Sequence, residues 1–518
     1  MAGLTVLALA LRLNRFGQPF LGDEISTLYI VRNDDLAGTV SALASDREIS
    51  PPLYFLTAWL FSKLGSAPEL IRVPSLIAGT LSIPLVYALG ARAVSRTAGM
   101  LAAAVMTLMP FMIFYSGDGR TYAMAIALLL ASTLSMLAAV RTGRRRWWVA
   151  YGVLTALAMY THYTAAFVLA AQLLWLLWAH PRVWKPAVLA NVGAVVLYAP
   201  WIPSMRADFD SPTIDILSAL QGDGFAIKRL AVETWSMGYP YVLPKEVPGR
   251  AAMVMIAGAL AVAAVAALVR WYRKRDESRR LPPVSRGVVL VFAIALATPV
   301  AEVLILIVTG NDLFGARNLS TSSAGLALAI GTTLASAGPL VGVVTAVIVL
   351  AGFSVGTART FRDGSDALRF DLAAEFIAAE SRPGDVVIDA ISAATTPVPL
   401  TPLDIHLDDK PPTTNLFFPQ GDPPFLPFKS DPLPPTPELE RAFSEAAPDG
   451  RVFLITTDSP VTVAPPGGEP AVDNTDPKET SFVLPPGSRI VDRVEYPGVV
   501  PLDVLVVEPG RGPTGGSE

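Results

Sequence analysis

Long apolar segments dominate the pattern of the first 357 residues. The segments "TAGMLAAAVMTLMPFMIFYSG" (97–117) and "AAMVMIAGALAVAAVAALV" (251–269) contain no charged side chain. A helix of about 20 apolar residues crosses the ~30 Å hydrocarbon core of a bilayer. The pattern therefore predicts a polytopic α-helical membrane protein rather than a soluble protein with buried helices.

Eleven segments qualify as membrane spans. We place them near 1–13, 72–91, 97–116, 120–140, 147–161, 163–179, 186–203, 251–270, 287–309, 319–336 and 338–356. The first is short for a span and lacks the basic residues that begin a signal peptide, so we interpret it as a tilted or incomplete helix. The apolar run 51–61 is shorter still, which is typical of an interfacial or re-entrant segment.

Basic clusters set the predicted orientation. If 51–61 does not cross and the N-terminus is cytoplasmic, the dense Lys/Arg clusters at 91–96, 141–146, 180–185 and 270–280 all lie inside. The positive-inside rule favours this arrangement. It predicts an N-in, C-out topology, in which the loops 14–71 and 204–250 share the outer face with the C-terminal region.

Residues 358–518 differ from the membrane module 1–357 because they are rich in Asp, Glu and Pro. The segments 382–390, 450–458 and 498–509 read as strands after turn signals. The segment 366–381 reads as an amphipathic helix, and the proline-rich segment 396–440 as a long loop. We expect a small extracytoplasmic α/β domain here.

Composition removes some alternatives. Only 16% of the residues are charged, against about 25% in soluble domains. The chain has no cysteine, which excludes disulfides and thiolate metal sites. A net charge of −4 does not favour a nucleic-acid partner.

A series of motifs follows the chain in a recognisable order. They are "LGDEISTLY" (21–29), "SPPLYFLTAWLFSKLG" (50–65), "ELIRVPSLIAGTLSIPLVYALG" (69–90), "PFMIFYSGDGRTYAM" (110–124), "YTHYTAAF" (160–167) and "FGARNLSTSSAG" (314–325). The ordered set resembles the GT-C glycosyltransferases of the protein-O-mannosyltransferase (family 39) type, in the bacterial branch that is also similar to lipid A aminoarabinose transferases. The sequence departs from that pattern at Ser50, where many relatives have His, and at Gly117-Asp118-Gly119, where Gln-Glu-Ala is common.

The resemblance implies an enzyme of the plasma membrane with its active site on the extracytoplasmic side. It would transfer a sugar, most commonly mannose, from a polyprenyl-phosphate donor to an acceptor, with inversion. The acceptor is open among protein, glycolipid and polysaccharide. Two alternatives are a sugar or lipid-carrier transporter (flippase) and a non-catalytic envelope scaffold. The absence of an internal repeat and the gathering of charges at one face argue against transport.

Two adjacent acids begin the first outer loop. The acidic residue of the family corresponds to Asp23, and a positioned carboxylate can take a proton from an attacking hydroxyl. We predict Asp23 as the base and Glu24 as a helper that orients substrate or binds a metal. The alternative is that Asp23 caps a helix over 24–32, with Glu24 in its first turn.

A phosphate leaving group needs cations, and arginine grips phosphate in a forked geometry. Predicted donor-phosphate ligands are, in order, Arg317, Arg120 and Arg72, with Tyr122 as a hydrogen-bond donor. The alternative for each arginine is a side chain that reaches the lipid headgroups, and for Arg72 a salt bridge to a loop carboxylate.

Further substrate-binding candidates lie near the same face. They are His162, Tyr163, Glu302 and Asp118. His162 and Tyr163 otherwise read as interfacial anchors, and Glu302 as a structural ion-pair partner inside a span. The aromatic residues of 204–250, Trp235, Tyr239 and Tyr241, suggest a lid over the cleft.

The cofactor remains undefined, because the acids have no strong metal-site spacing. If a divalent metal takes part, the candidate ligands are Glu24, Asp46 and Glu48.

Overall fold

The computed structural model describes residues 1–20, 22–44, 48–211, 224–274, 283–361, 369–389, 403–407, 413–415, 443–446, 449–456, 461–463, 471–473, 481–497 and 501–510. The chain divides into two compact units. One comprises Met1–Gly17 and Ile30–Arg362, and the other Gln18–Tyr29 and Asp363–Glu518. We call them the membrane unit and the outer unit.

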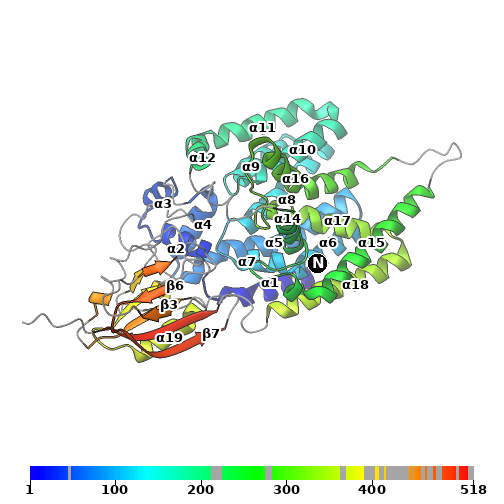
Figure 1. Cartoon of the computed structure of the whole chain (residues 1–518). Coiled ribbons are helices and arrows are strands. Elements are labelled where there is room, and N and C mark those ends of the chain that lie inside the picture. The colour runs from blue at the N-terminus through cyan, green and yellow to red at the C-terminus, as the bar shows by residue number, and fades with distance from the viewer. Residues whose placement is uncertain are drawn as a thin grey trace, which may run out of the picture. The chain divides into compact units, whose positions relative to one another are not determined.

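The membrane unit is helical (Figure 1). A helix stands at each of the predicted spans, with one span represented by a broken pair. The helices are α1 (Ala2–Phe16), α5 (Val73–Ala93), α6 (Arg96–Leu108), α7 (Pro110–Gly117), α8 (Tyr122–Thr142), α9 (Arg145–Met159), α10 (Ala165–Ala179), α11 (Trp184–Tyr198), α15 (Arg250–Tyr272), α16 (Arg286–Thr309), α17 (Ser323–Ser336) and α18 (Pro339–Thr360).

Within the described residues, six helical segments are long and apolar enough to cross a membrane, or seven if the α6–α7 pair is one broken span. These segments are Pro68–Ala93, Tyr122–Thr142, Pro181–Phe209, Lys245–Tyr272, Arg286–Thr309 and Pro339–Thr360. The polytopic membrane character is therefore present. The count of eleven spans stays a prediction, because α1, α9, α10 and α17 have only 14 or 15 residues.

The predicted span 97–116 is a bent pair of helices. α6 ends at Leu108 and α7 starts at Pro110, with a bend of 65° between their axes. Pro110 supplies no backbone N–H and its ring clashes with a continuing helix, so it starts a new helix instead. All residues of α7 are buried, and α7 packs against α1 and α5. The bend therefore carries the chain into the protein interior.

Short helices fill the predicted outer loops. They are α2 (Gly22–Val31), α3 (Leu36–Leu43), α4 (Leu53–Ser62), α12 (Ile202–Phe209) and α14 (Phe225–Ser236). α4 covers most of the apolar run 51–61, and its ten residues span only ~15 Å. This length agrees with the prediction that the run does not cross.

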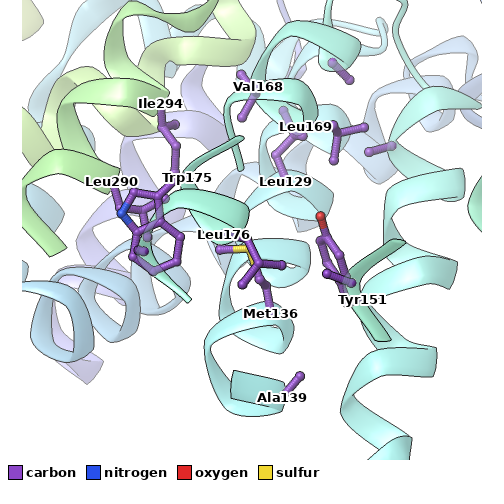
Figure 2. Close-up of a cluster of buried hydrophobic side chains, with 14 of the residues drawn as sticks. Leu129, Met136, Ala139, Tyr151, Val168, Leu169, Trp175, Leu176, Leu290 and Ile294 are labelled. Carbon is purple, nitrogen blue, oxygen red and sulfur yellow. The ribbon is translucent and has the colours of Figure 1, made fainter. Parts of the chain in front are cut away.

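A hydrophobic cluster joins α8, α9, α10 and α16 (Figure 2). Leu129, Tyr151, Trp175 and Leu290 belong to it and are buried. The indole N–H of Trp175 donates to the carbonyl of Arg286 at 2.7 Å, so the buried polar atom is satisfied. This packing fixes the helices whose ends carry the candidate site.

The outer unit contains a mixed sheet in the order β2-β1-β3-β8-β7, where β1 is parallel to β2 and β3. A smaller sheet has the order β4-β6-β5. The strands are β1 (Val386–Asp389), β2 (Thr413–Asn415), β3 (Val452–Thr456), β4 (Val461–Val463), β5 (Ala471–Asp473), β6 (Ser481–Leu484), β7 (Arg489–Tyr496) and β8 (Leu502–Glu508). α19 (Phe370–Glu380) and α20 (Leu403–His406) pack on one face of the larger sheet.

The predicted strands and helix of this region are present as β1, β3, β8 and α19. β1 and β3 are buried on both faces, which explains why they read as continuous apolar runs. Most of the predicted loop 396–440 lies outside the described residues, although α20 and β2 fall within it.

Candidate active site

The motif "YSGDGRTYAM" forms the turn between α7 and α8 and supplies an aromatic stack. The rings of Tyr115 and Tyr122 lie 4.3 Å apart, and Tyr122 lies 5.3 Å from the imidazole of His162. Tyr115 and Tyr122 are buried. At this turn, side chains from α7, from α8 and from the turn before α10 meet.

His162 lies in the turn between α9 and α10. Its Nδ1 accepts a hydrogen bond from the backbone N–H of Thr164 at 3.2 Å and lies 2.9 Å from the Thr164 hydroxyl. Burial, together with the charges of Arg120 and Arg317, lowers the pKa of His162 to about 3. The imidazole is therefore neutral near pH 7, and its proton sits on Nε2, which can donate to a substrate oxygen.

A threonine chain supports this turn. The Thr164 hydroxyl lies 3.1 Å from that of Thr321, which lies 2.9 Å from that of Thr298. These residues come from α10, the turn before α17, and α16. This series of threonine hydroxyls links the His162 turn to the segment that carries Arg317.

Arg120 makes a forked ion pair. Its Nη1 and Nη2 donate to the two carboxylate oxygens of Glu48 at 2.6 and 3.1 Å. The guanidinium also lies 5.5 Å from the Phe55 ring centre, and the Arg120 carbonyl accepts from the Ser75 hydroxyl at 2.9 Å. The fork that binds Glu48 has the geometry that binds phosphate.

The structure brings two of the three predicted arginines to one place. The charges of both Arg120 and Arg317 act on His162, and that of Arg317 also acts on Tyr115. Arg72 instead donates through Nη1 to the carbonyls of Arg15 and Phe16 at the end of α1, at 3.2 and 2.8 Å. It therefore caps α1, as a cation near a helix C-terminus is expected to do.

The remaining predicted substrate ligands have other neighbours. The Tyr163 hydroxyl donates to Asp208 and accepts from the Trp201 indole at 3.2 Å, so it ties α12 to the His162 turn. Asp118 is buried beside Tyr115.

Glu302 is buried in α16. The charged groups that act on it are Asp312 and Lys228, and these two form an ion pair with each other. Its charged neighbourhood therefore includes a lysine from α14.

Asp23 and Glu24 lie in the first turn of α2. The helix begins at Gly22, so Asp23 is inside the first turn rather than at the predicted cap position. Acidic side chains are favoured there by the helix dipole. Asp23 is half-buried and Glu24 is fully buried.

No described residues form a group of three or more His, Asp or Glu side chains that could hold a metal ion. Asp46 lies outside the described residues. Both carboxylate oxygens of Glu48 accept from Arg120. A divalent metal therefore stays a prediction, with Glu24 and Glu48 as its described candidate ligands.

Sequence reasoning missed Arg15, which is buried with its guanidinium 4.3 Å from the Phe114 ring centre. A Cβ added at Gly117 would lie 2.5 Å from Cβ of Arg15. A residue with a side chain at position 117 would therefore clash with Arg15, and glycine leaves room for it. Gly117, where the sequence departs from the family pattern, was the sequence feature that could have indicated this contact.

The predicted lid residues divide into two kinds. Trp235 is buried and donates to the Ser323 hydroxyl at 2.9 Å, and Tyr239 is buried against Phe114. Tyr241 alone of the three is exposed.

Comparison with known proteins gives one family match. The family of dolichyl-phosphate-mannose-protein mannosyltransferases matches residues 50–204. A comparison with curated protein sequences finds no match.

One similar solved structure is the oligosaccharyltransferase AglB of Archaeoglobus fulgidus in complex with an inhibitory peptide and a dolichol-phosphate. Its sequence is 12% identical and the TM-score is 0.50. The match covers 88% of this chain and 69% of that one. The same archaeal enzyme tethered to an acceptor peptide is 13% identical with a TM-score of 0.42, covering 75% of this chain and 61% of that one. ArnT of Cupriavidus metallidurans bound to undecaprenyl phosphate is 14% identical with a TM-score of 0.43, covering 97% of each chain. The match to AglB shows a shared fold, and the matching family model is of the type that the sequence motifs resemble over residues 50–204.

Proposed function

We propose that this chain transfers a sugar, most simply mannose, from a polyprenyl-phosphate donor to an acceptor on the extracytoplasmic side of the membrane, with inversion. The observation that carries the proposal is the buried Arg120 fork in the turn that holds the Tyr115–Tyr122–His162 stack, where the charges of Arg120 and Arg317 both act on His162. Guanidinium groups in a poorly hydrated site suit an anionic phosphate better than a neutral substrate. The lipid phosphates bound by AglB and ArnT agree with this donor class.

The chain's own residues divide the work. Arg317 and Arg120 bind the phosphate oxygens, and Arg120 exchanges the Glu48 carboxylate for the phosphate when donor enters. Tyr122 and the neutral His162 donate hydrogen bonds to the same oxygens. These donors stabilise the negative charge that collects on the phosphate as it leaves.

The reaction balances without an added reagent. The acceptor hydroxyl attacks the anomeric carbon, and a new carbon–oxygen bond forms as the bond from that carbon to the phosphate oxygen breaks. The hydroxyl proton passes to the Asp23 carboxylate, and the electron pair leaves with polyprenyl phosphate. The buried Glu24 acts as a helper that orients the substrate hydroxyl.

The test is transfer by the full chain in reconstituted vesicles supplied with radiolabelled polyprenyl-phosphate mannose and an acceptor extract. Asp23→Asn should lower the rate about 10²–10⁴-fold, as expected for a lost general base. Asp34→Asn, an exposed acid nearby in sequence, is the matched control and should be unaffected. Wild-type turnover by Asp23→Asn would contradict the base assignment. Movement of labelled lipid across the bilayer without transfer would favour the transporter alternative.

A further inference from the structure

Tyr241 has an unusual backbone conformation. It is the one non-glycine residue with positive φ (66°) in the described ranges. A bulky side chain rarely adopts this region, and such conformations persist where the surrounding structure holds them for a functional reason.

The local turn explains how the conformation arises. Val242 N–H donates to the Tyr239 carbonyl at 3.3 Å, and Pro240 and Tyr241 lie between them. Proline at the second position and positive φ at the third are the features of a type II turn, whose third position normally carries glycine. The chain thus holds a tyrosine where turn geometry favours glycine.

Neighbouring side chains hold the turn in place. Tyr239 is 2% exposed and packs edge-on against Phe114 at 5.2 Å. Tyr241 lies 5.7 Å from the same ring in a tilted arrangement, yet it is 57% exposed. One tyrosine of the turn is therefore an anchor, and the other presents its ring outward.

The exposed ring begins a continuous series of ring contacts that ends at His162. Phe114 lies 5.1 Å from Tyr115, Tyr115 lies 4.3 Å from Tyr122, and Tyr122 lies 5.3 Å from His162. Electrostatic interaction also links Tyr241 directly to Tyr115, on which Arg317 acts as well. The ring series therefore connects the exposed Tyr241 ring with the residues of the proposed phosphate site.

We propose that Tyr241 is a stacking platform for the sugar ring of the donor. The inference rests on the proposed function. The C–H face of a sugar ring packs against an aromatic face, and the sugar of a polyprenyl-phosphate donor is bonded directly to the phosphate. Simple anchoring at the bilayer interface would require neither the positive φ nor the ring series. It is the competing explanation that the test addresses.

The test compares two lipids on the full chain in nanodiscs: decaprenyl phosphate and decaprenyl-phosphate mannose, with glucose- and arabinose-loaded lipids in parallel. Wild type should bind at least one sugar-loaded lipid more tightly than the bare lipid. Tyr241→Gly removes the ring and keeps the turn, and it should reduce this preference about three- to tenfold without changing affinity for the bare lipid. Tyr241→Phe should keep the preference, and Tyr272→Gly, which removes another exposed ring, should change neither affinity.

The outcomes separate the two proposals. If wild type binds neither lipid, the proposed function fails and the platform with it. If wild type binds the bare lipid and prefers no sugar-loaded lipid, or if Tyr241→Gly keeps the wild-type preference, only the platform is contradicted. Equal loss of affinity for both lipids would show that the ring contacts lipid rather than sugar, which also contradicts the platform.

Discussion

Two buried carboxylates, one in each unit, pair with arginine in different ways. In the outer unit, the Asp385 carboxylate accepts hydrogen bonds from the backbone N–H groups of Arg382 and Arg451, at 2.8 and 2.7 Å. It also accepts one from the Arg451 guanidinium at 3.0 Å. In the membrane unit, the two carboxylate oxygens of Glu48 accept parallel side-chain hydrogen bonds from Arg120.

The difference lies in what each pair connects. The Asp385 carboxylate joins the turn before β1 to the start of β3, so it satisfies backbone groups that folding would otherwise leave buried. The Arg120–Glu48 pair joins side chains beside an aromatic cluster, and an anion of similar shape can replace the carboxylate. Similar chemical groups therefore maintain the fold in one unit and offer an exchangeable contact in the other.

Arg317→Ala gives the largest expected effect. If the membrane-unit arginines serve the reaction, removing this one should lower transfer about 10²–10³-fold, as for the loss of one donor to a developing anion. Arg317→Lys should fall between, because lysine keeps the charge and loses the fork. Initial rates in vesicles check this, with the exposed Arg144→Ala as control. If Arg317→Ala lowered stability but left transfer at the wild-type rate, Arg317 would maintain the fold rather than serve the reaction, and the contrast between the two units would be contradicted.

Asp385→Ala should affect folding instead. Loss of the carboxylate leaves backbone N–H groups and a guanidinium without their acceptor, and we expect the outer unit to lose about 3 kcal/mol of stability. Hydrogen exchange of β1 and β3 in the full chain measures this. The matched control is Asp371→Ala, which breaks the more exposed Arg369–Asp371 pair and should cost about 0–1 kcal/mol. Equal costs for the two variants would contradict the structural role of Asp385.

Glu48→Gln should sharpen the exchange idea. The amide releases Arg120 from its anionic partner, so affinity for bare polyprenyl phosphate should rise several-fold, while stability without lipid should fall because the buried guanidinium has lost its counter-charge. Binding titration in nanodiscs gives the affinity, and thermal unfolding gives the stability. Weaker binding would show that Glu48 positions Arg120 rather than competing for it.

His162→Gln has the smallest expected effect. Because His162 has a pKa of about 3, its imidazole stays neutral between pH 5 and 8, so the variant should show a lower rate but a pH–rate profile parallel to wild type. Unfolded histidine titrates near 6.5, so below that pH the unfolded state binds the extra proton and wild-type stability falls toward pH 3. Because glutamine does not titrate, His162→Gln should remove this contribution to the fall in stability at low pH. A changed profile between pH 5 and 8 would place a charged His162 in the mechanism.

Much of the fold follows from the sequence, because lipid-facing helices and doubly buried strands both leave long apolar runs. The break at Pro110 was harder to predict, since proline is tolerated inside other spans, such as Pro84 in α5 and Pro299 in α16. The motifs predicted Arg120, Tyr122 and His162 as substrate ligands, and the structure places the Tyr122 ring beside His162, on which the charge of Arg120 also acts. The pairing of Arg120 with Glu48 could not be predicted, because the two residues lie 72 positions apart and no local sequence pattern connects them.

α7 has a consequence for biogenesis. Its eight residues cover ~12 Å, too little to hold a segment in a bilayer by itself, and every one of them is buried. The surface that buries α7 is formed in part by α1 and α5, so α7 can be buried only when these helices have packed around it. We therefore expect the "YSGDGR" turn to acquire its shape only after α1 and α5 pack against α7, and a chain without α1 to leave this turn unformed.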